Sequence, residues 1–126
     1  MKKGVIIKAS SRSHGDTAKV VSFFKEITGF DSIDLNDKII GHFDYDFLNH
    51  NKDVGRRLRE MNMGVISRSN ENIVFDGFTM PFEKSAEYLG MTYLGHIHTW
   101  VNRGRVSDEV KSLMVLFANK NNLQYV

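Results

Sequence analysis

Short apolar runs alternate with amphipathic stretches along this chain. Gly4–Ile7 and Met63–Ile66 are continuous apolar runs, and Thr92–Trp100 is rich in strand-forming residues. Short continuous runs of this kind are typical of strands buried on both faces of a parallel sheet. One more strand, second in chain order, is predicted at Phe30–Leu35, where aspartates among the apolar residues indicate a position at the sheet edge.

Four stretches place apolar residues at helical spacing. The first follows the polar segment Ser10–Thr17 and ends at Gly29, a residue suited to a helix C-terminus. The second lies around residues 53–62, the third begins after a Thr79 cap, and the fourth begins after a Ser107 cap. Strands that alternate with helices predict an α/β protein with a parallel sheet.

Composition narrows the class of protein. The chain has 126 residues, which fits a single domain over 1–126, and 41% of them are hydrophobic. There is no cysteine, which excludes disulfides, thiolate catalysis and cysteine-ligated metals. No apolar run approaches the roughly 18 residues of a membrane span, so we expect no membrane partner and a cytoplasmic location.

The segment Ser10–Thr17 carries the strongest chemical signal. It lies between a buried strand and a helix, where doubly wound sheets bind anionic ligands. Free backbone N–H groups and the helix dipole favour negative charge there, Arg12 can pair with phosphate, and Gly15 permits a tight turn. The segment is neither a Walker A loop nor a G-x-G-x-x-G loop. The alternative is an ordinary capped turn without a ligand.

Residues Ile6–Thr17 resemble the start of the flavodoxin-like NAD(P)H-dependent FMN reductase and quinone reductase family. In that family a first strand is followed by Gly-Ser-Ser/Pro-Arg-x-x-Gly-Asn-Thr, and this loop holds the FMN phosphate. Phe78–Met91 and Tyr93–Gly95 resemble the family's fourth helix and fifth strand. The resemblance implies a flavodoxin-like three-layer sandwich that binds FMN, a small phosphate-bearing ligand, with NAD(P)H as co-substrate.

The match supplies a set of candidate cofactor-binding residues. Asp16 stands where the family more often has Asn, and its carboxylate would repel phosphate unless it offers only its backbone N–H. The implied phosphate ligands are Ser10, Arg12, Gly15, Asp16 and Thr17. To these we add the rest of the loop and two serines after the Met63–Ile66 run: Ser13, His14, Ser67 and Ser69. His14 could equally be a solvent-facing turn residue.

One strand–helix unit of the family has no counterpart here. Its third strand, which carries a Pro-Val-Tyr-Trp-like loop against the flavin ring, is missing, so the chain is truncated in the middle around residues 50–55. We therefore expect a shortened parallel sheet of order 2-1-4-5 in the family's numbering. An open strand edge would favour a homodimer, possible by domain swapping. Candidate substitutes for the ring wall are Phe43, Tyr45 and Trp100, together with the loop over residues 67–70.

Two functions from different classes remain open. The first is an FMN-binding NAD(P)H-dependent oxidoreductase, in which the flavin does the chemistry and no side chain is a catalytic acid or base. The second is a non-catalytic remnant that acts by oligomerising or by contacting a partner. A net charge of +2 does not favour nucleic acid. His96 and His98 could share a strand face, but without a third ligand they predict no metal site.

Overall fold

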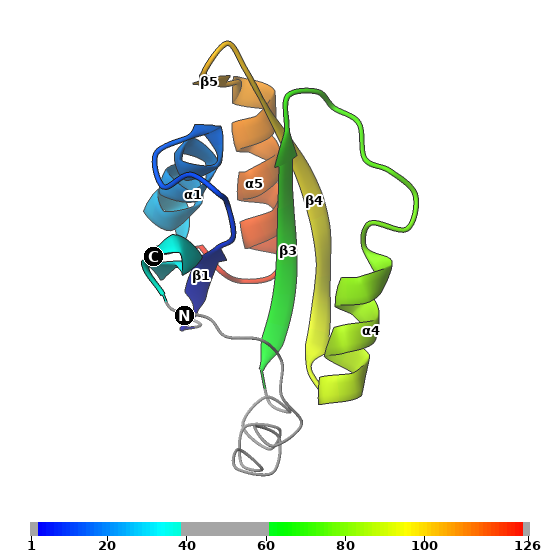
Figure 1. Cartoon of the computed structure of the whole chain (residues 1–126). Helices are drawn as coiled ribbons and strands as arrows, with labels where there is room; N and C mark the ends of the chain where they lie inside the picture. Colours follow the sequence, from blue (N-terminus) through cyan, green and yellow to red (C-terminus); the bar gives the residue numbers. More distant parts are fainter. Residues whose placement is uncertain (1–2, 39–60, 125–126) are drawn as a thin grey trace. The chain divides into compact units, whose positions relative to one another are not determined.

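The computed structural model describes residues 3–38 and 61–124 (Figure 1). Strands and helices alternate, which confirms the predicted α/β class. Contacts divide the described residues into a first unit, 3–38, 67–73 and 97–124, and a second unit, 61–66 and 74–96. The elements are β1 (Val5–Lys8), α1 (Asp16–Thr28), β2 (Asp31–Asp34), η1 (Leu35–Asp37), β3 (Asn62–Ser69), α4 (Met80–Leu89), β4 (Thr92–Asn102), β5 (Arg105–Val106) and α5 (Asp108–Lys120).

The described strands form two sheets. β1 and β2 are parallel, with Val5 opposite Asp31 and Lys8 opposite Asp34. The second sheet has the order β3-β4-β5, and β5 runs antiparallel to β4. A single sheet of order 2-1-4-5 would require β1 to pair with β3, and the described residues do not include that pair. The single-sheet order therefore stays a prediction.

β5 is a strand that the sequence pattern did not indicate. It follows β4 through a two-residue turn in which Arg103 has φ 53° and Gly104 has φ 70°. Positive φ at both central residues is the geometry of a tight hairpin, which Gly104 adopts without steric cost. With only two residues, β5 is too short to show an alternating pattern.

Helix boundaries follow the predicted signals. Gly29 ends α1 in the left-handed conformation with φ 72°, and the Ser107 side chain accepts a hydrogen bond from the Val110 amide at the start of α5. Thr79 precedes α4 as predicted, although its side chain makes no capping bond. The helix predicted around 53–62 lies outside the described residues except at its end, where Asn62 already belongs to β3.

β3 extends further than the apolar run that predicted it. The strand continues through Ser67 and Arg68 to Ser69, a segment expected to be loop. Polar residues can remain in a strand when each side chain finds a partner on its own face, and the side chains of these three residues do so.

The core of the first unit lies between α1 and α5. Phe24 of α1 and Phe117 of α5 are buried with their ring centroids 6.4 Å apart. Val110 and Met114 of α5 and Val101 of β4 are also fully or almost fully buried. This packing fixes α1, and with it the loop that precedes α1.

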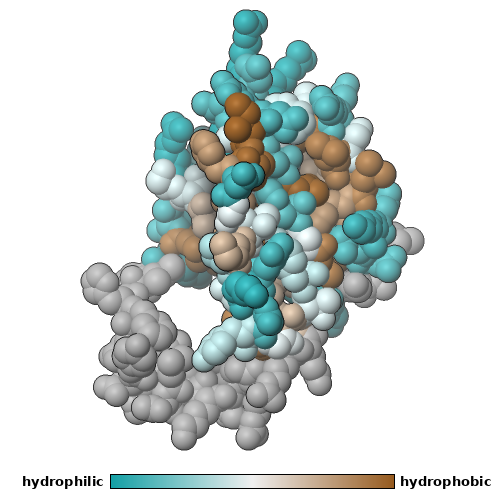
Figure 2. Space-filling view, turned by 90° about the vertical axis from the view of Figure 1, so that its right-hand side faces the viewer, coloured by the Kyte–Doolittle hydropathy of each residue, from teal (hydrophilic) through white to brown (hydrophobic). Residues whose placement is uncertain are grey.

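The second unit exposes several large apolar side chains. Ala86 is its fully buried residue on α4. Met61, which precedes β3, is one of them. The others come from α4 and the loop before it: Val74, Phe75, Phe78, Met80, Phe82 and Tyr88. The face of the chain that carries α4 accordingly shows hydrophobic residues among hydrophilic ones (Figure 2). Burial, and secondarily the charge of Glu83, raises the pKa of Tyr93 in this unit.

Candidate functional site

The loop between β1 and α1 is held by bonds to its backbone carbonyls. Asn36 Nδ2 donates to the Ser10 carbonyl at 2.7 Å, and Lys8 Nζ donates to the Ser13 carbonyl at 2.5 Å. The Arg12 amide donates to Ser10 Oγ at 3.4 Å. These bonds engage two carbonyl oxygens that would otherwise present partial negative charge to an incoming anion.

A nearly buried ion pair between Lys8 and Asp34 contacts the loop, because Lys8 also donates to the Ser13 carbonyl. Lys8 Nζ lies 3.1 Å from Asp34 Oδ2, and the two side chains are 7% and 16% exposed. The parallel register places them side by side, because Lys8 is directly opposite Asp34. The Asn36 amide, which donates to Asp34 Oδ1 at 3.0 Å, holds the pKa of Asp34 below its ordinary value, and Lys8 adds to this. Neither residue was predicted, since their pairing depends on strand register.

The N-terminus of α1 has no side-chain cap. Gly15 is the N-cap residue and has no side chain that could accept from the first amides of the helix, although the Ala18 amide donates to the Gly15 carbonyl at 3.1 Å. The first amides of a helix lack partners within the helix and carry the positive end of its dipole. The start of α5 differs, because Ser107 Oγ already accepts from Val110 N at 3.3 Å. α1 is thus the better prepared of the two to receive an anion.

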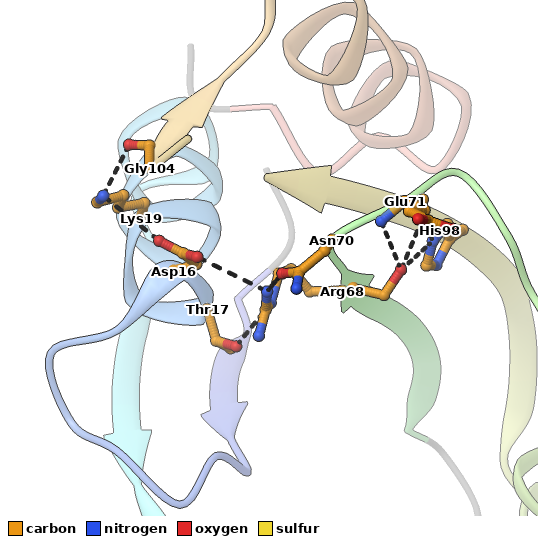
Figure 3. Close-up of polar contacts among 9 residues, drawn as sticks. Asp16, Thr17, Lys19, Arg68, Asn70, Glu71, His98 and Gly104 are labelled. Carbon is orange, nitrogen blue, oxygen red and sulfur yellow. Dashed lines mark hydrogen bonds and ion pairs between the residues drawn. The ribbon is translucent and has the colours of Figure 1, made fainter. Parts of the chain in front are cut away.

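Arg68 brings a guanidinium from the end of β3 to this helix start (Figure 3). Its Nε donates to Thr17 Oγ1 at 3.2 Å, and its Nη1 donates to Asn70 Oδ1 at 3.1 Å. Nη1 also lies 3.9 Å from Asp16 Oδ2. Arg68 was not among the phosphate ligands predicted from the sequence. Only its position at the end of a buried strand could have indicated its contact with α1.

Two cations flank the Asp16 carboxylate. Arg68 approaches one oxygen, and Lys19 Nζ lies 3.4 Å from the other while it also donates to the Gly104 carbonyl at 2.7 Å (Figure 3). The carboxylate therefore has its own partners, and the two cations outnumber it by one charge. The two positive charges therefore offset the repulsion that the Asp16 carboxylate would otherwise exert on a phosphate.

The remaining loop residues lie around the same helix start. A Cβ placed on Gly15 would lie 3.7 Å from Arg12 Nε, so the exposed Arg12 side chain folds back to the helix N-cap. Ser13 and the exposed His14 border a hollow of about 250 Å³ that Lys8 and Asp34 also line. This volume is below the roughly 300 Å³ of small ligand pockets. The hollow is therefore too small for a flavin ring, and Gly15, Asp16, Thr17 and Arg68 do not line it.

Ser67 and Ser69 lie on the other side of β3 from Arg68. Ser67 Oγ lies 2.7 Å and Ser69 Oγ 3.1 Å from the two ring nitrogens of His98. Successive side chains of a strand point to opposite faces, so Arg68 faces α1 while its two neighbours face His98. The nine predicted site residues thus fall into two places: seven around the loop and two beside His98.

A flavin fits the first of these places in part. The hydroxyls, the uncapped amides and the two arginines are the donors that a phosphate requires. For the ring, the described candidate is Trp100, which stacks on His98 with centroids 6.2 Å apart. Trp100 is thus on the Ser67 face of the sheet, opposite the face from which Arg68 reaches α1, so it does not supply a ring wall beside the phosphate loop. The other two candidate wall residues, Phe43 and Tyr45, lie outside the described residues.

His96 and His98 have different surroundings. The His96 ring lies 5.3 Å from the Phe78 ring in the second unit, whereas His98 contacts serines in the first. Within residues 3–38 and 61–124, no three His, Asp or Glu side chains are grouped to hold a metal ion. The helices of this part of the chain are also too short or too polar to cross a bilayer.

Comparisons of the chain with protein-family models, with curated proteins and with solved structures find no match. The candidate function therefore rests on the residues and their geometry.

Proposed function

We propose that this chain binds the phosphate group of FMN at the loop Ser10–Thr17, as a shortened flavodoxin-like relative of the NAD(P)H-dependent FMN reductases. In this proposal NAD(P)H is the co-substrate, the flavin carries the hydride chemistry, and the protein works in the cytoplasm. The protein's own contribution is to bind and orient the phosphate end of the cofactor.

The observation that carries the proposal is the contact of Arg68 with the start of α1. Its Nε–Thr17 Oγ1 bond of 3.2 Å fixes the guanidinium beside the uncapped helix amides. Its Nη1 lies near Asp16, whose charge it offsets together with Lys19. A guanidinium beside free amides and hydroxyls is a donor set suited to a phosphate ester.

Titration with FMN, followed by flavin fluorescence, tests the proposal. Riboflavin is the matched ligand because it lacks only the phosphate, and inorganic phosphate is the competitor. We expect FMN to quench on binding, phosphate to reverse the quenching, and riboflavin to bind more weakly. Equal affinity for FMN and riboflavin would contradict phosphate recognition, and no binding of either would exclude the flavin.

Variants at Arg68 locate the site. A hydrogen bond to a charged group contributes about 1.5–3 kcal/mol, so Arg68→Ala should weaken FMN binding by roughly 10- to 150-fold. Arg68→Lys keeps the positive charge but loses the planar guanidinium. Its affinity for FMN should therefore lie between those of the wild type and Arg68→Ala. Arg105→Ala removes the same charge from the exposed β5 and is the control. An equal loss in both alanine variants would mean that net charge alone attracts FMN.

A second function, assembly of a non-catalytic remnant, is favoured by apolar side chains that the described residues leave exposed on one face of the β1–β2 sheet. Val5, Ile7 and Ile33 lie on that face, at 51%, 60% and 37% exposure. A three-layer sandwich would cover such apolar side chains. Light scattering of the chromatographed protein tests this function: a dimer without FMN affinity would support the remnant, and a monomer at high concentration would exclude the homodimer.

A further inference from the structure

His98 lies between two serine hydroxyls and one backbone carbonyl at the ends of β3 and β4. Ser67 Oγ is 2.7 Å from Nδ1. The Glu71 carbonyl oxygen is 2.9 Å from Nε2, and the two residues lie side by side (Figure 3). Ser69 Oγ is 3.1 Å from Nε2 and donates to the same carbonyl at 2.6 Å. The ring is therefore held through both of its nitrogens.

The Glu71 contact determines the tautomer of the neutral ring. A carbonyl oxygen can only accept, so Nε2 must carry the proton of the 2.9 Å bond. Nδ1 is then unprotonated and accepts from the Ser67 hydroxyl. A serine that donates to an imidazole, which in turn is oriented by a third group, is the arrangement of an activated nucleophile.

We propose that Ser67 is an acyl-accepting nucleophile and His98 its general base, in a site for neutral carboxylic esters. The reaction class follows from charge. Among the residues that the structure describes, the partners of the His98 ring are two hydroxyls, a carbonyl oxygen and the stacked Trp100 ring, all of them uncharged. Arg68, which a phosphate ester would need, points to the other face of β3. Ser67, His98 and Trp100 are all partly exposed, so a substrate can reach them.

The step balances with water as the second reactant. Ser67 Oγ forms a bond to the ester carbonyl carbon and passes its proton to His98 Nδ1. The bond from that carbon to the leaving oxygen then breaks, and the leaving group takes the proton. Water next attacks the acyl-serine and gives a proton to Nδ1, and that proton returns to Ser67 as the acid departs. The Nε2–Glu71 bond holds the ring throughout.

The test uses the full chain with p-nitrophenyl acetate. Release of p-nitrophenol is followed by absorbance, and the acetylated residue is identified by peptide mass spectrometry. We expect acetyl on Ser67 in the wild type and in Ser112→Ala, which removes an exposed serine of α5 and serves as the control. Ser67→Ala should lose this modification.

His98→Gln keeps Ser67 but cannot take its proton. A general base contributes about 100-fold or more, so acetylation of Ser67 should slow by at least that factor. Circular dichroism establishes that each variant is folded, and the glutamine variant tests the proposal even where Ser67→Ala does not fold. Wild-type rates in His98→Gln, or acetyl found on lysines or on His98 with Ser67 unmodified, would overturn the proposal. Binding of FMN at the loop is independent of this result.

Discussion

The two faces of the sheet at the ends of β3 and β4 differ in what covers them. On one face Thr99 and Val101 are buried, and the polar side chain of Arg68 leaves that face to bond with α1. On the other face Ser67, His98 and Trp100 are only half-buried and contact one another. Because side chains alternate along a strand, the tripeptide Ser67–Ser69 places Arg68 on one face and the two serines on the other, so the two proposed sites would share one segment of the chain.

The largest expected effect is on the packed side. Met114 of α5 is fully buried, and truncation of a buried methionine costs about 2–5 kcal/mol. Met114→Ala should therefore lower the free energy of unfolding by that amount in a urea titration. Leu116→Ala is the matched control because Leu116 lies on the same helix and is 64% exposed. Equal losses in both variants would mean that this side of α5 is not a packed core.

Substitutions on the two faces should separate the two sites. Arg68→Ala should weaken FMN binding by roughly 10- to 150-fold and leave acetylation of Ser67 unchanged. His98→Gln should slow acetylation of Ser67 and leave FMN binding unchanged. Fluorescence titration and peptide mass spectrometry on the same two proteins measure both quantities. If either variant loses both FMN binding and acetylation of Ser67, the two faces of the sheet do not carry separate sites.

The smallest effect that we expect is on the pH dependence of stability, through the ion pair of Lys8 and Asp34. The pKa of Asp34 is lower in the folded chain than its ordinary 3.8, so its ionised form stabilises the fold above that pH, and this contribution is lost as the pH falls below it. Asp34→Asn should therefore be less stable than the wild type at about pH 7, and the difference should shrink at about pH 2. Asp37→Asn, at the exposed end of η1, is the control. A difference that is constant with pH would exclude the ionised Asp34 as its cause.

Much of the fold could be predicted because it depends on local signals. Gly29 and Ser107 mark helix ends through backbone conformation and a capping bond, and both act as predicted. The loop before α1 was located to within two residues, because it follows an apolar run and precedes a helical pattern, but Asp16 and Thr17 already belong to α1. β5 was missed because a two-residue strand has no period.

The partners within the site could not be predicted in the same way. Lys8 meets Asp34 through strand register, and Arg68 meets Thr17 across 51 positions of the chain. Ser67 and Ser69 were grouped with the loop because a segment expected to be loop can turn its side chains in any direction. As part of β3 the same residues must alternate, which sends the serines to His98 and the arginine to α1.

In the proposed function an anion binds at the start of α1, beside Arg68. Amide chemical shifts of ¹⁵N-labelled protein during an FMN titration, repeated with inorganic phosphate, test it most directly. Both ligands should shift the amides of Ser13–Thr17 and the side-chain Nε signal of Arg68, and phosphate should leave those of Ser67 and His98 in place. Phosphate-induced shifts centred on His98, or no shifts near Gly15 with either ligand, would mean that the anion does not bind at the start of α1.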